Sequence, residues 1–326
     1  MPRVQVTTGA RLHAGFCNLS LTGERLYGGV GTALSEPQIT VVAEPAAEIT
    51  PAEAPVERYA ERACEILGVE GADVQLETTF PRHVGLGSGT QLALAVLSAV
   101  AASYDQSPQV RSRAPAMDRG GRSGVGVAAF ERGGFIVDGG HPTERFTTER
   151  PEPGDWQVPP VVARHELPTD WRFLLVVPNV EAGRSGQGED ESMRSVVENA
   201  DPAITDELTT LLVQRLLPAA AEGRLTAFGS ALEEFGRLNG IWYADEQGGV
   251  YRPPVGALIE TLRETPGVYG VGQSSWGPTV YGVTDTDRAA VARSAGESAL
   301  ESIGIDGTVR TVSPAKGGAT TRVLRR

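Results

Sequence analysis

A glycine-rich segment at residues 85–91 runs directly into an apolar stretch, and this junction constrains the fold more than any other part of the chain. The segment reads Gly-Leu-Gly-Ser-Gly-Thr-Gln, and the apolar stretch covers residues 92–102. Alternate glycines let the backbone take positive φ and approach a ligand closely, while alanine and leucine favour a helix. Unpaired N–H groups and the helix dipole would then meet at one point, which suits a phosphate or diphosphate. An ordinary loop before a core helix is the alternative, because short glycine patterns recur by chance.

Two common phosphate-binding motifs do not explain this segment. A GxxxxGK[ST] motif does not occur, since the only lysine, Lys316, is followed by glycine. The GxGxxG spacing of dinucleotide-binding proteins is also missing. The expected phosphate ligands are therefore the residues of the loop itself, Gly85, Gly87, Ser88, Gly89, Thr90 and Gln91.

The charge of the chain excludes several classes of partner. A net charge of −12 over 326 residues argues against nucleic acid and anionic membrane. No stretch approaches the roughly 18 apolar residues of a membrane helix, and the first residues read as a strand rather than a signal peptide. Two cysteines offer neither a disulfide framework nor a metal spacing, so we expect a cytoplasmic protein. The acidic, lysine-poor composition is typical of a high-salt cytoplasm or a GC-rich genome.

An acidic protein that binds an anion must gather arginines locally. Five lie near glycine-rich segments, namely Arg11, Arg25, Arg82, Arg119 and Arg122.

We expect two domains, at residues 1–160 and 161–326, with a long surface connection at 142–168 that contains the boundary. Strands are expected at 4–8, 39–42, 74–78, 135–138, 171–177, 267–271 and 279–283, with a polar connection at 104–117. Helices are expected at 55–67, 204–221, 225–238, 255–264 and 287–303. A glycine-rich loop at 182–188 precedes acidic residues 189–191, which suit the first turn of a helix. The second half thus reads as antiparallel strands covered by helices.

Four segments together carry a family resemblance. They are residues 11–16 with 28–34, residues 85–91, residues 119–141, and residues 270–281. The second resembles the PxxxGLGSSAA motif of the GHMP kinase superfamily, with Gly-Thr-Gln in place of Ser-Ala-Ala. Taken together, the four segments resemble the β-ribofuranosylaminobenzene 5′-phosphate synthase family of that superfamily, over nearly the whole chain.

The resemblance implies a transferase with the two-domain GHMP fold, an N-terminal α/β domain and a ferredoxin-like α+β C-terminal domain. Members join para-aminobenzoate to phosphoribosyl pyrophosphate with loss of carbon dioxide and pyrophosphate, in methanopterin-type cofactor biosynthesis. Magnesium and a homodimer are expected. Departure of pyrophosphate leaves an oxocarbenium-like ribose, so metal, arginine or helix N–H groups must neutralise the leaving group. The aromatic ring must be held against the ribose carbon.

On this resemblance the candidate residues fall into groups. The catalytic candidates are Arg11, His13, Arg122, Asp138 and His141, and Ser88 or Thr90 is placed near magnesium. The substrate-binding candidates are Arg119, Gln273, Ser274, Ser275 and Trp276. Each has a structural alternative: a core histidine for His13, a turn-stabilising carboxylate for Asp138, and a first-turn polar residue for Gln91. Trp276 either stacks on the acceptor ring or anchors a domain interface, and the arginines are either anion ligands or solvated.

Two departures bear on the activity. No acidic-pair ribose-phosphate loop follows a strand, so phosphoribosyl pyrophosphate rests on the resemblance. Tyr27 stands where many family members carry an aspartate. The competing hypotheses are an ATP-dependent small-molecule kinase and a catalytically silent ligand-binding relative.

Overall fold

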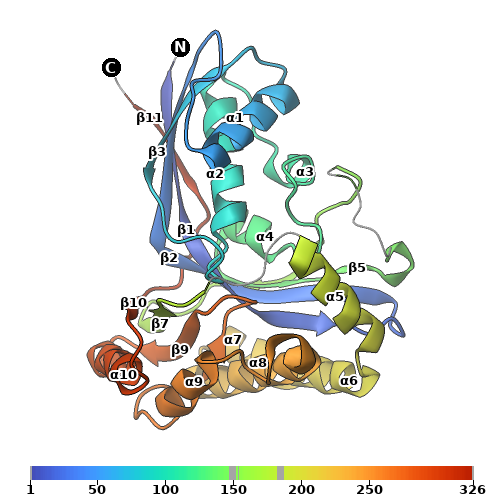
Figure 1. Cartoon of the computed structure of the whole chain (residues 1–326), viewed down its shortest axis with the longest axis vertical. Coiled ribbons are helices and arrows are strands. Elements are labelled where there is room, and N and C mark those ends of the chain that lie inside the picture. Colours follow the sequence, from blue (N-terminus) through green and yellow to red (C-terminus); the bar gives the residue numbers. More distant parts are fainter. Residues whose placement is uncertain (1, 147–151, 153, 182–186, 325–326) are drawn as a thin grey trace.

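Two antiparallel sheets form the framework of the protein (Figure 1). The computed structural model describes residues 2–146, 152, 154–181 and 187–324. A seven-stranded sheet has the order β11-β1-β2-β4-β6, with β3 and β5 also pairing with β2, and a four-stranded sheet has the order β10-β7-β9-β8. The predicted mixture of helices and antiparallel strands is confirmed.

The first two strands are much longer than their hydrophobic patterns predict. β1 covers Arg3–Asn18 and β2 covers Arg25–Pro45. The pairing of β1 with β2 shifts register between Gly9 and Arg11 and again between His13 and Gly15. Such irregularities re-aim side chains along a strand, and here they alter the pairing on either side of His13.

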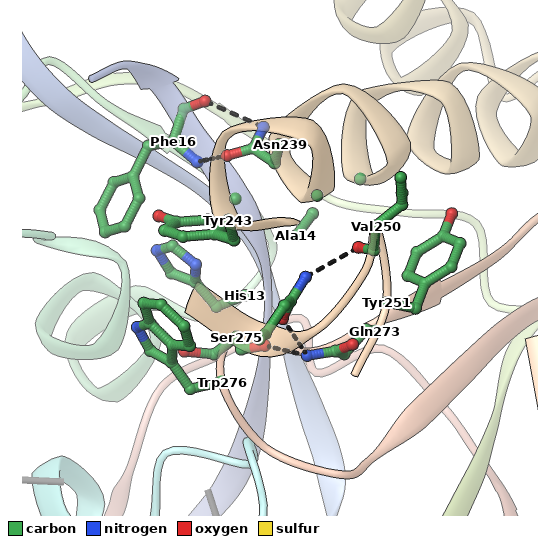
Figure 2. Close-up of a pocket in the computed structure, with 14 residues that line it drawn as sticks. His13, Ala14, Phe16, Asn239, Tyr243, Val250, Tyr251, Gln273, Ser275 and Trp276 are labelled. Atoms are coloured by element: carbon green, nitrogen blue, oxygen red, sulfur yellow. Dashed lines mark hydrogen bonds between the residues drawn. The ribbon is translucent and has the colours of Figure 1, made fainter. Parts of the chain in front are cut away.

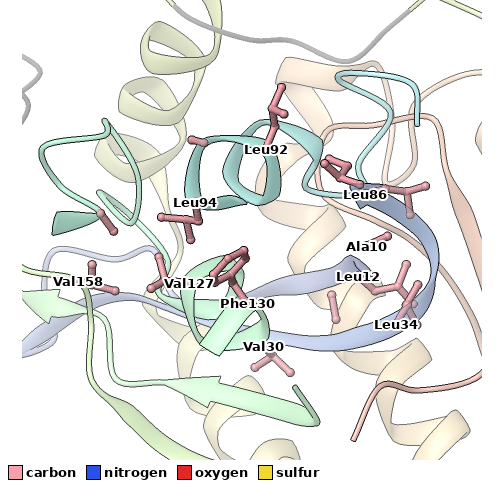
Figure 3. Close-up of a cluster of buried hydrophobic side chains, with 14 of the residues drawn as sticks. Ala10, Leu12, Val30, Leu34, Leu86, Leu92, Leu94, Val127, Phe130 and Val158 are labelled. Carbon is pink, nitrogen blue, oxygen red and sulfur yellow. The ribbon is translucent and has the colours of Figure 1, made fainter. Parts of the chain in front are cut away.

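One face of the larger sheet carries the helices of the first half (Figure 1). These are α1 (Ala54–Leu67), α2 (Ser88–Ser103), α3 (Val110–Arg113) and α4 (Val125–Arg132). Helix α2 is buried along nearly its whole length. Leu92 and Leu94 of α2 belong to one buried cluster with Phe130 of α4 and with Leu12 and Leu34 of the sheet, and Figure 3 shows Leu94 on the side of α2 that faces α4. This core fixes the amino end of α2 against the sheet.

The second half builds the smaller sheet and a helical layer. Its strands are β7 (Trp171–Pro178), β8 (Val271–Gln273), β9 (Val280–Asp285) and β10 (Gly307–Val312). Its helices are α5 (Gln187–Asn199), α6 (Pro202–Leu211), a π-helical turn (Leu212–Leu216), α7 (Leu217–Glu222), α8 (Leu225–Gln247), α9 (Val255–Arg263) and α10 (Ala289–Ser302). The ring of Phe228 lies 5.2 Å from that of Phe135 and 5.0 Å from that of Trp171, so one core connects both sheets.

Several predicted boundaries are wrong. The stretch 142–168 is not only a surface connection, because it contains the end of β5 (His141–Pro142), a 3-10 turn (Thr143–Arg145) and β6 (Val161–His165), which pairs with β4 (Phe135–Asp138). The 104–117 connection contains α3. Of the predicted strand 267–271 only Val271 is in a strand, although the backbone of Tyr269 and Gly270 still hydrogen-bonds to that of Val283.

The sheets do not divide at residue 160. The larger sheet contains β6 and β11 (Thr320–Leu324), which follow residue 160, as well as β3 (Ala72–Thr78) and other strands that precede it. Strand pairing therefore does not mark a boundary at residue 160, and the two-domain division stays a prediction. Residues 182–186 of the predicted loop lie outside the described residues. Residues 189–191 lie near the start of α5. No helix in the described part of the chain is both long and apolar enough to span a bilayer.

Candidate active site

A cavity of about 730 Å³ lies over the amino end of α2. Its wall contains the glycine loop, the β1 bulge, residues 118–123, part of α5 and the loop 275–277. The candidates that line it are Arg11, His13, Gly85, Gly87, Ser88, Gly89, Thr90, Arg119, Arg122, His141, Ser275 and Trp276. The structure therefore brings together residues from four distant segments.

The glycine loop presents an uncapped helix end to this cavity. Gly87 is the N-cap of α2, with φ of 77°, and no side chain caps the helix there. Gly85 also has positive φ, at 93°. The first N–H groups of a helix need partners from outside it, so this loop has the geometry of an anion site.

The loop is fixed by contacts from the second half of the chain. The Ser274 hydroxyl donates to the Gly85 carbonyl oxygen at 2.7 Å, and the Thr279 hydroxyl donates to the Val84 carbonyl oxygen at 2.5 Å. Ser274 also accepts from the His13 N–H at 3.1 Å and is fully buried. The Ser274 hydroxyl is thus engaged within the protein, and its binding of substrate stays a prediction.

Gln91 is also bonded within the protein. Its side chain is 0% exposed, accepts from the Thr8 hydroxyl at 2.7 Å and donates to the Gly126 carbonyl oxygen at 2.9 Å. These contacts favour the alternative of a structural polar residue on the first turn of α2, and phosphate binding by Gln91 stays a prediction. It ties α2 to both β1 and α4.

Asp138 organises the backbone beside the cavity rather than facing it. Its carboxylate accepts from the Ser123 hydroxyl at 2.9 Å and from the N–H groups of Gly124 and Gly140 at 2.7 and 2.9 Å. The side chain is buried, and burial raises the pKa of the carboxyl despite these bonds. These bonds support the turn-stabilising alternative for Asp138, and its catalytic assignment stays a prediction.

His13 reaches the cavity as a neutral imidazole. Burial, with the nearby Arg11 charge, lowers the pKa of His13 from 6.5 to about 3. Its Nε2 has no hydrogen-bond partner among the described residues. A Cβ on Gly29 would lie 2.9 Å from that Nε2 and 2.1 Å from the Ser123 Oγ, so only glycine leaves room for this cluster. His13 is therefore placed to accept or donate a hydrogen bond, not to supply a proton at neutral pH.

The ring of Tyr27 contacts those of both His141 and Phe16. The Tyr27 ring centroid is 6.3 Å from that of His141 and 5.5 Å from that of Phe16. Burial lowers the pKa of His141. Tyr27 itself has φ of 70° and lines the cavity, so the residue that replaces an acid is part of the site wall.

Arginines dominate the charge of the wall. Arg11 Nη1 donates to the Gly85 carbonyl oxygen at 3.1 Å, Arg119 donates to the Tyr59 hydroxyl, and Arg122 forms an ion pair with Asp190 of α5. The sequence analysis missed several further lining residues, Arg58, Arg145 and Arg194, and gave Arg82 no specific role. Arg25 instead donates to the carbonyl oxygens of Gly139 and Gly140.

A smaller aromatic pocket, shown in Figure 2, shares part of its lining with the main cavity. Trp276 lies edge-on to Tyr243 at 4.6 Å between centroids, and Phe16 lies edge-on to His13 at 4.9 Å. His13, Phe16, Ser275 and Trp276 line both spaces. The amide of Gln273 lines the smaller pocket, where it accepts from the Arg252 N–H at 3.1 Å and donates to the Ser275 carbonyl oxygen at 3.0 Å.

The residues fit magnesium only as an ion carried by the substrate. Across the described ranges no three His, Cys, Asp or Glu side chains are grouped to hold a metal. Hydroxyls of Ser88 and Thr90 and the carboxylate of Asp118 do line the cavity with the glycine loop. Magnesium is commonly held by one or two such groups plus substrate phosphates and water.

Comparison with known proteins identifies the structural class to which the chain belongs. Family models for the N-terminal domain of GHMP kinases and for the GHMP kinase C terminal match residues 55–134 and 216–301. Homoserine kinase from Cytophaga hutchinsonii has a TM-score of 0.68 over 99% of this chain and 98% of its own, at 16% identity. Galactokinase from Lactococcus lactis, complexed with galactose, has a TM-score of 0.68 over 98% and 95%, at 14% identity. The predicted GHMP kinase fold is confirmed.

Sequence relatives narrow the class to one family. The beta-ribofuranosylphenol 5'-phosphate synthase of Methanothermobacter thermautotrophicus is 33% identical over 309 residues, covering 90% of this chain and 92% of the relative. The protein of the same name from Archaeoglobus fulgidus is 33% identical over 299 residues, covering 89% and 91%. The chain belongs to this family of synthases and is an enzyme of the GHMP superfamily, as the resemblance implied.

Proposed function

We propose that this enzyme transfers the 5-phosphoribosyl group of phosphoribosyl pyrophosphate to a para-substituted benzoate, releasing diphosphate and carbon dioxide. The relatives carry a ribofuranosylphenol 5'-phosphate in their name. A phenol product favours para-hydroxybenzoate as acceptor, with para-aminobenzoate as the related candidate. The observation that carries the proposal is the uncapped amino end of α2, faced by arginines and adjoining an aromatic pocket.

The leaving group belongs at the glycine loop. As the C1–oxygen bond of the ribose breaks, its electron pair leaves with the diphosphate. Helix N–H groups from Ser88 onward and the Arg119 guanidinium are fixed donors in the same wall, and such preorganised donors stabilise developing negative charge. Magnesium, when bound, supplies further neutralisation of the diphosphate, near Ser88, Thr90 and Asp118.

The acceptor belongs at the aromatic pocket. The ring carbon that bears the carboxylate bonds to C1, and the carboxylate leaves as carbon dioxide with its bonding pair returned to the ring. No external proton is needed for this balance, which agrees with a neutral His13. Trp276, Tyr243 and Phe16 supply apolar faces that hold a planar ring and exclude water from the cation.

The test uses carboxyl-labelled acids. Purified enzyme with magnesium and phosphoribosyl pyrophosphate is given labelled para-hydroxybenzoate or para-aminobenzoate, at low and high salt, and released carbon dioxide is counted. We expect release with at least one acid and a matching amount of diphosphate. Trp276→Ala should raise the KM for the acid while leaving diphosphate binding unchanged. Turnover of ATP with small alcohols and no release of carbon dioxide would overturn the proposal in favour of a kinase.

Assembly and location are separate proposals that rest on the family resemblance. We propose a homodimer in the cytoplasm. Light scattering on the purified chain tests the first, and fractionation of the source cells tests the second.

A further inference from the structure

Tyr59 of α1 stands behind the cavity wall and contacts two arginines that line it. Its side chain is 3% exposed, so it does not itself reach the cavity. The ζ carbons of Arg58 and Arg119 lie 5.3 and 5.4 Å from the centre of its ring. Cations within about 6 Å of an aromatic centroid are attracted to its face.

Arg119 is held from several sides. Its guanidinium donates to the Tyr59 hydroxyl, and its backbone carbonyl accepts from Trp156 Nε1 at 3.0 Å. Its backbone N–H donates to the Ala114 carbonyl oxygen at 2.8 Å. A flexible side chain is thus fixed in one orientation, and none of the ion pairs among the described residues involves Arg119.

That orientation is toward the glycine loop. A Cβ on Gly89, the second residue of α2, would lie 3.7 Å from Arg119 Nη2. Arg119 Nε is buried and has no hydrogen-bond partner within the described part of the chain. The guanidinium therefore overlies the first turn of α2 with donor capacity left for a ligand.

We propose that Tyr59 is a positioning residue that presents Arg119 to the diphosphate of the substrate. The inference rests on the proposed function, since it assumes a diphosphate at the amino end of α2. The tyrosine accepts one guanidinium N–H and supports the cation with its ring. Binding then requires little further ordering of Arg119, and such preorganisation increases affinity.

The test measures binding of inorganic diphosphate with magnesium by calorimetry, independently of turnover. Tyr59→Phe removes the hydroxyl and keeps the ring, and should weaken binding about tenfold. Tyr104→Phe is the matched control, because that hydroxyl donates to the Gly71 carbonyl oxygen at 2.6 Å at the far end of α2. The control should bind diphosphate as the unchanged enzyme does.

A double-mutant cycle separates positioning from general stability. If Tyr59 acts through Arg119, Tyr59→Phe should have no further effect on affinity in an Arg119→Ala background. An equal loss in both backgrounds, or unchanged affinity in Tyr59→Phe alone, would overturn the inference. If Tyr59→Phe does not fold, Arg119→Lys replaces it in the test. This change keeps the charge and loses the planar fork, and should also weaken binding about tenfold; unchanged binding would overturn the inference. Failure of the unchanged enzyme to bind diphosphate would instead count against the proposed function.

Discussion

The hydroxyl of Ser274 lies 2.7 Å from the carbonyl oxygen of Gly85, to which it donates a hydrogen bond across 189 residues. The same oxygen atom of Ser274 accepts the N–H of His13. The turn between β8 and β9 thereby sets the conformation of the glycine loop and of the β1 bulge together. The positions of the glycine loop and of the β1 bulge in the cavity wall therefore depend on one buried side chain, Ser274.

Removing that hydroxyl should loosen the loop. We expect Ser274→Ala to lower the free energy of unfolding by about 1–3 kcal/mol, because it leaves the buried His13 N–H without a partner. Diphosphate affinity should fall as well. Ser98→Ala is the matched control, since the Ser98 hydroxyl is buried without a partner in the described structure and its loss should be close to neutral. Equal denaturation midpoints for both variants would contradict this role of Ser274.

Gly85 should tolerate no side chain. Its φ is 93°, and a Cβ would lie 2.2 Å from the Ser274 carbonyl oxygen, a backbone atom that cannot move alone. We expect Gly85→Ala to cost at least about 3 kcal/mol of stability and to abolish diphosphate binding. Gly68→Ala isolates backbone strain, because Gly68 has φ of 66° and no neighbour within 4 Å of a Cβ. That control should cost only about 1 kcal/mol and keep binding intact.

Asp138 should be needed for folding more than for chemistry. Asp138→Asn replaces an acceptor with an amide NH₂ that must face the N–H of Gly124 or Gly140. We expect a loss of about 3 kcal/mol in urea unfolding. Among molecules that remain folded, kcat should change far less than it would for loss of a catalytic acid. A full-stability variant with no activity would show that the carboxylate acts on substrate.

The buried His13 should make the protein sensitive to acid. The folded state keeps it neutral down to about pH 3, whereas the unfolded chain takes up the proton near 6.5. The unfolded state therefore binds more protons in this window, and stability falls as the pH drops from 6.5 toward 3. The slope from this one group reaches about 1.4 kcal/mol per pH unit.

His13→Gln should flatten that part of the profile. The check is urea unfolding between about pH 4 and pH 7, compared with His165→Gln in strand β6 as control. Because each variant is compared through its slope, a constant loss of stability does not affect the result. Parallel profiles for His13→Gln and the unchanged protein would show that His13 is not held neutral.

The parts of the fold that sequence predicts well are those with strong local patterns. Strand 135–138 and the helices α1 and α9 appear close to where apolar spacing places them. Strands β10 and β11 were missed because most of their residues are exposed or half-exposed and show no apolar alternation. The glycine-rich part of β2 was missed because glycine is unfavourable in strands. Glycine is required there by a tertiary contact, since a Cβ on Gly31 would lie 2.2 Å from the Leu12 carbonyl oxygen.

The same distinction between local sequence patterns and tertiary contacts applies to the candidate site. The glycine loop itself was predictable, since its composition encodes both positive φ and a helix start. Whether Gln91 or Ser274 faces a ligand or the protein depends on partners 83 and 189 residues away, which local sequence does not specify. Tyr59 gave no signal at all, because its role comes from the folded position of Arg119.

The pairing of β11 with β1 also affects how the protein is made. Residues 320–324 cover the outer edge of residues 3–7, so this edge of β1 stays unpaired until residues 320–324 have been synthesised. Until this pairing forms, the backbone N–H and C=O groups along that edge have no strand partner and can pair with other nascent chains. A product that ends before residue 320 would keep the residues that line the cavity but leave this edge of the larger sheet unpaired, so such a truncation should favour aggregation.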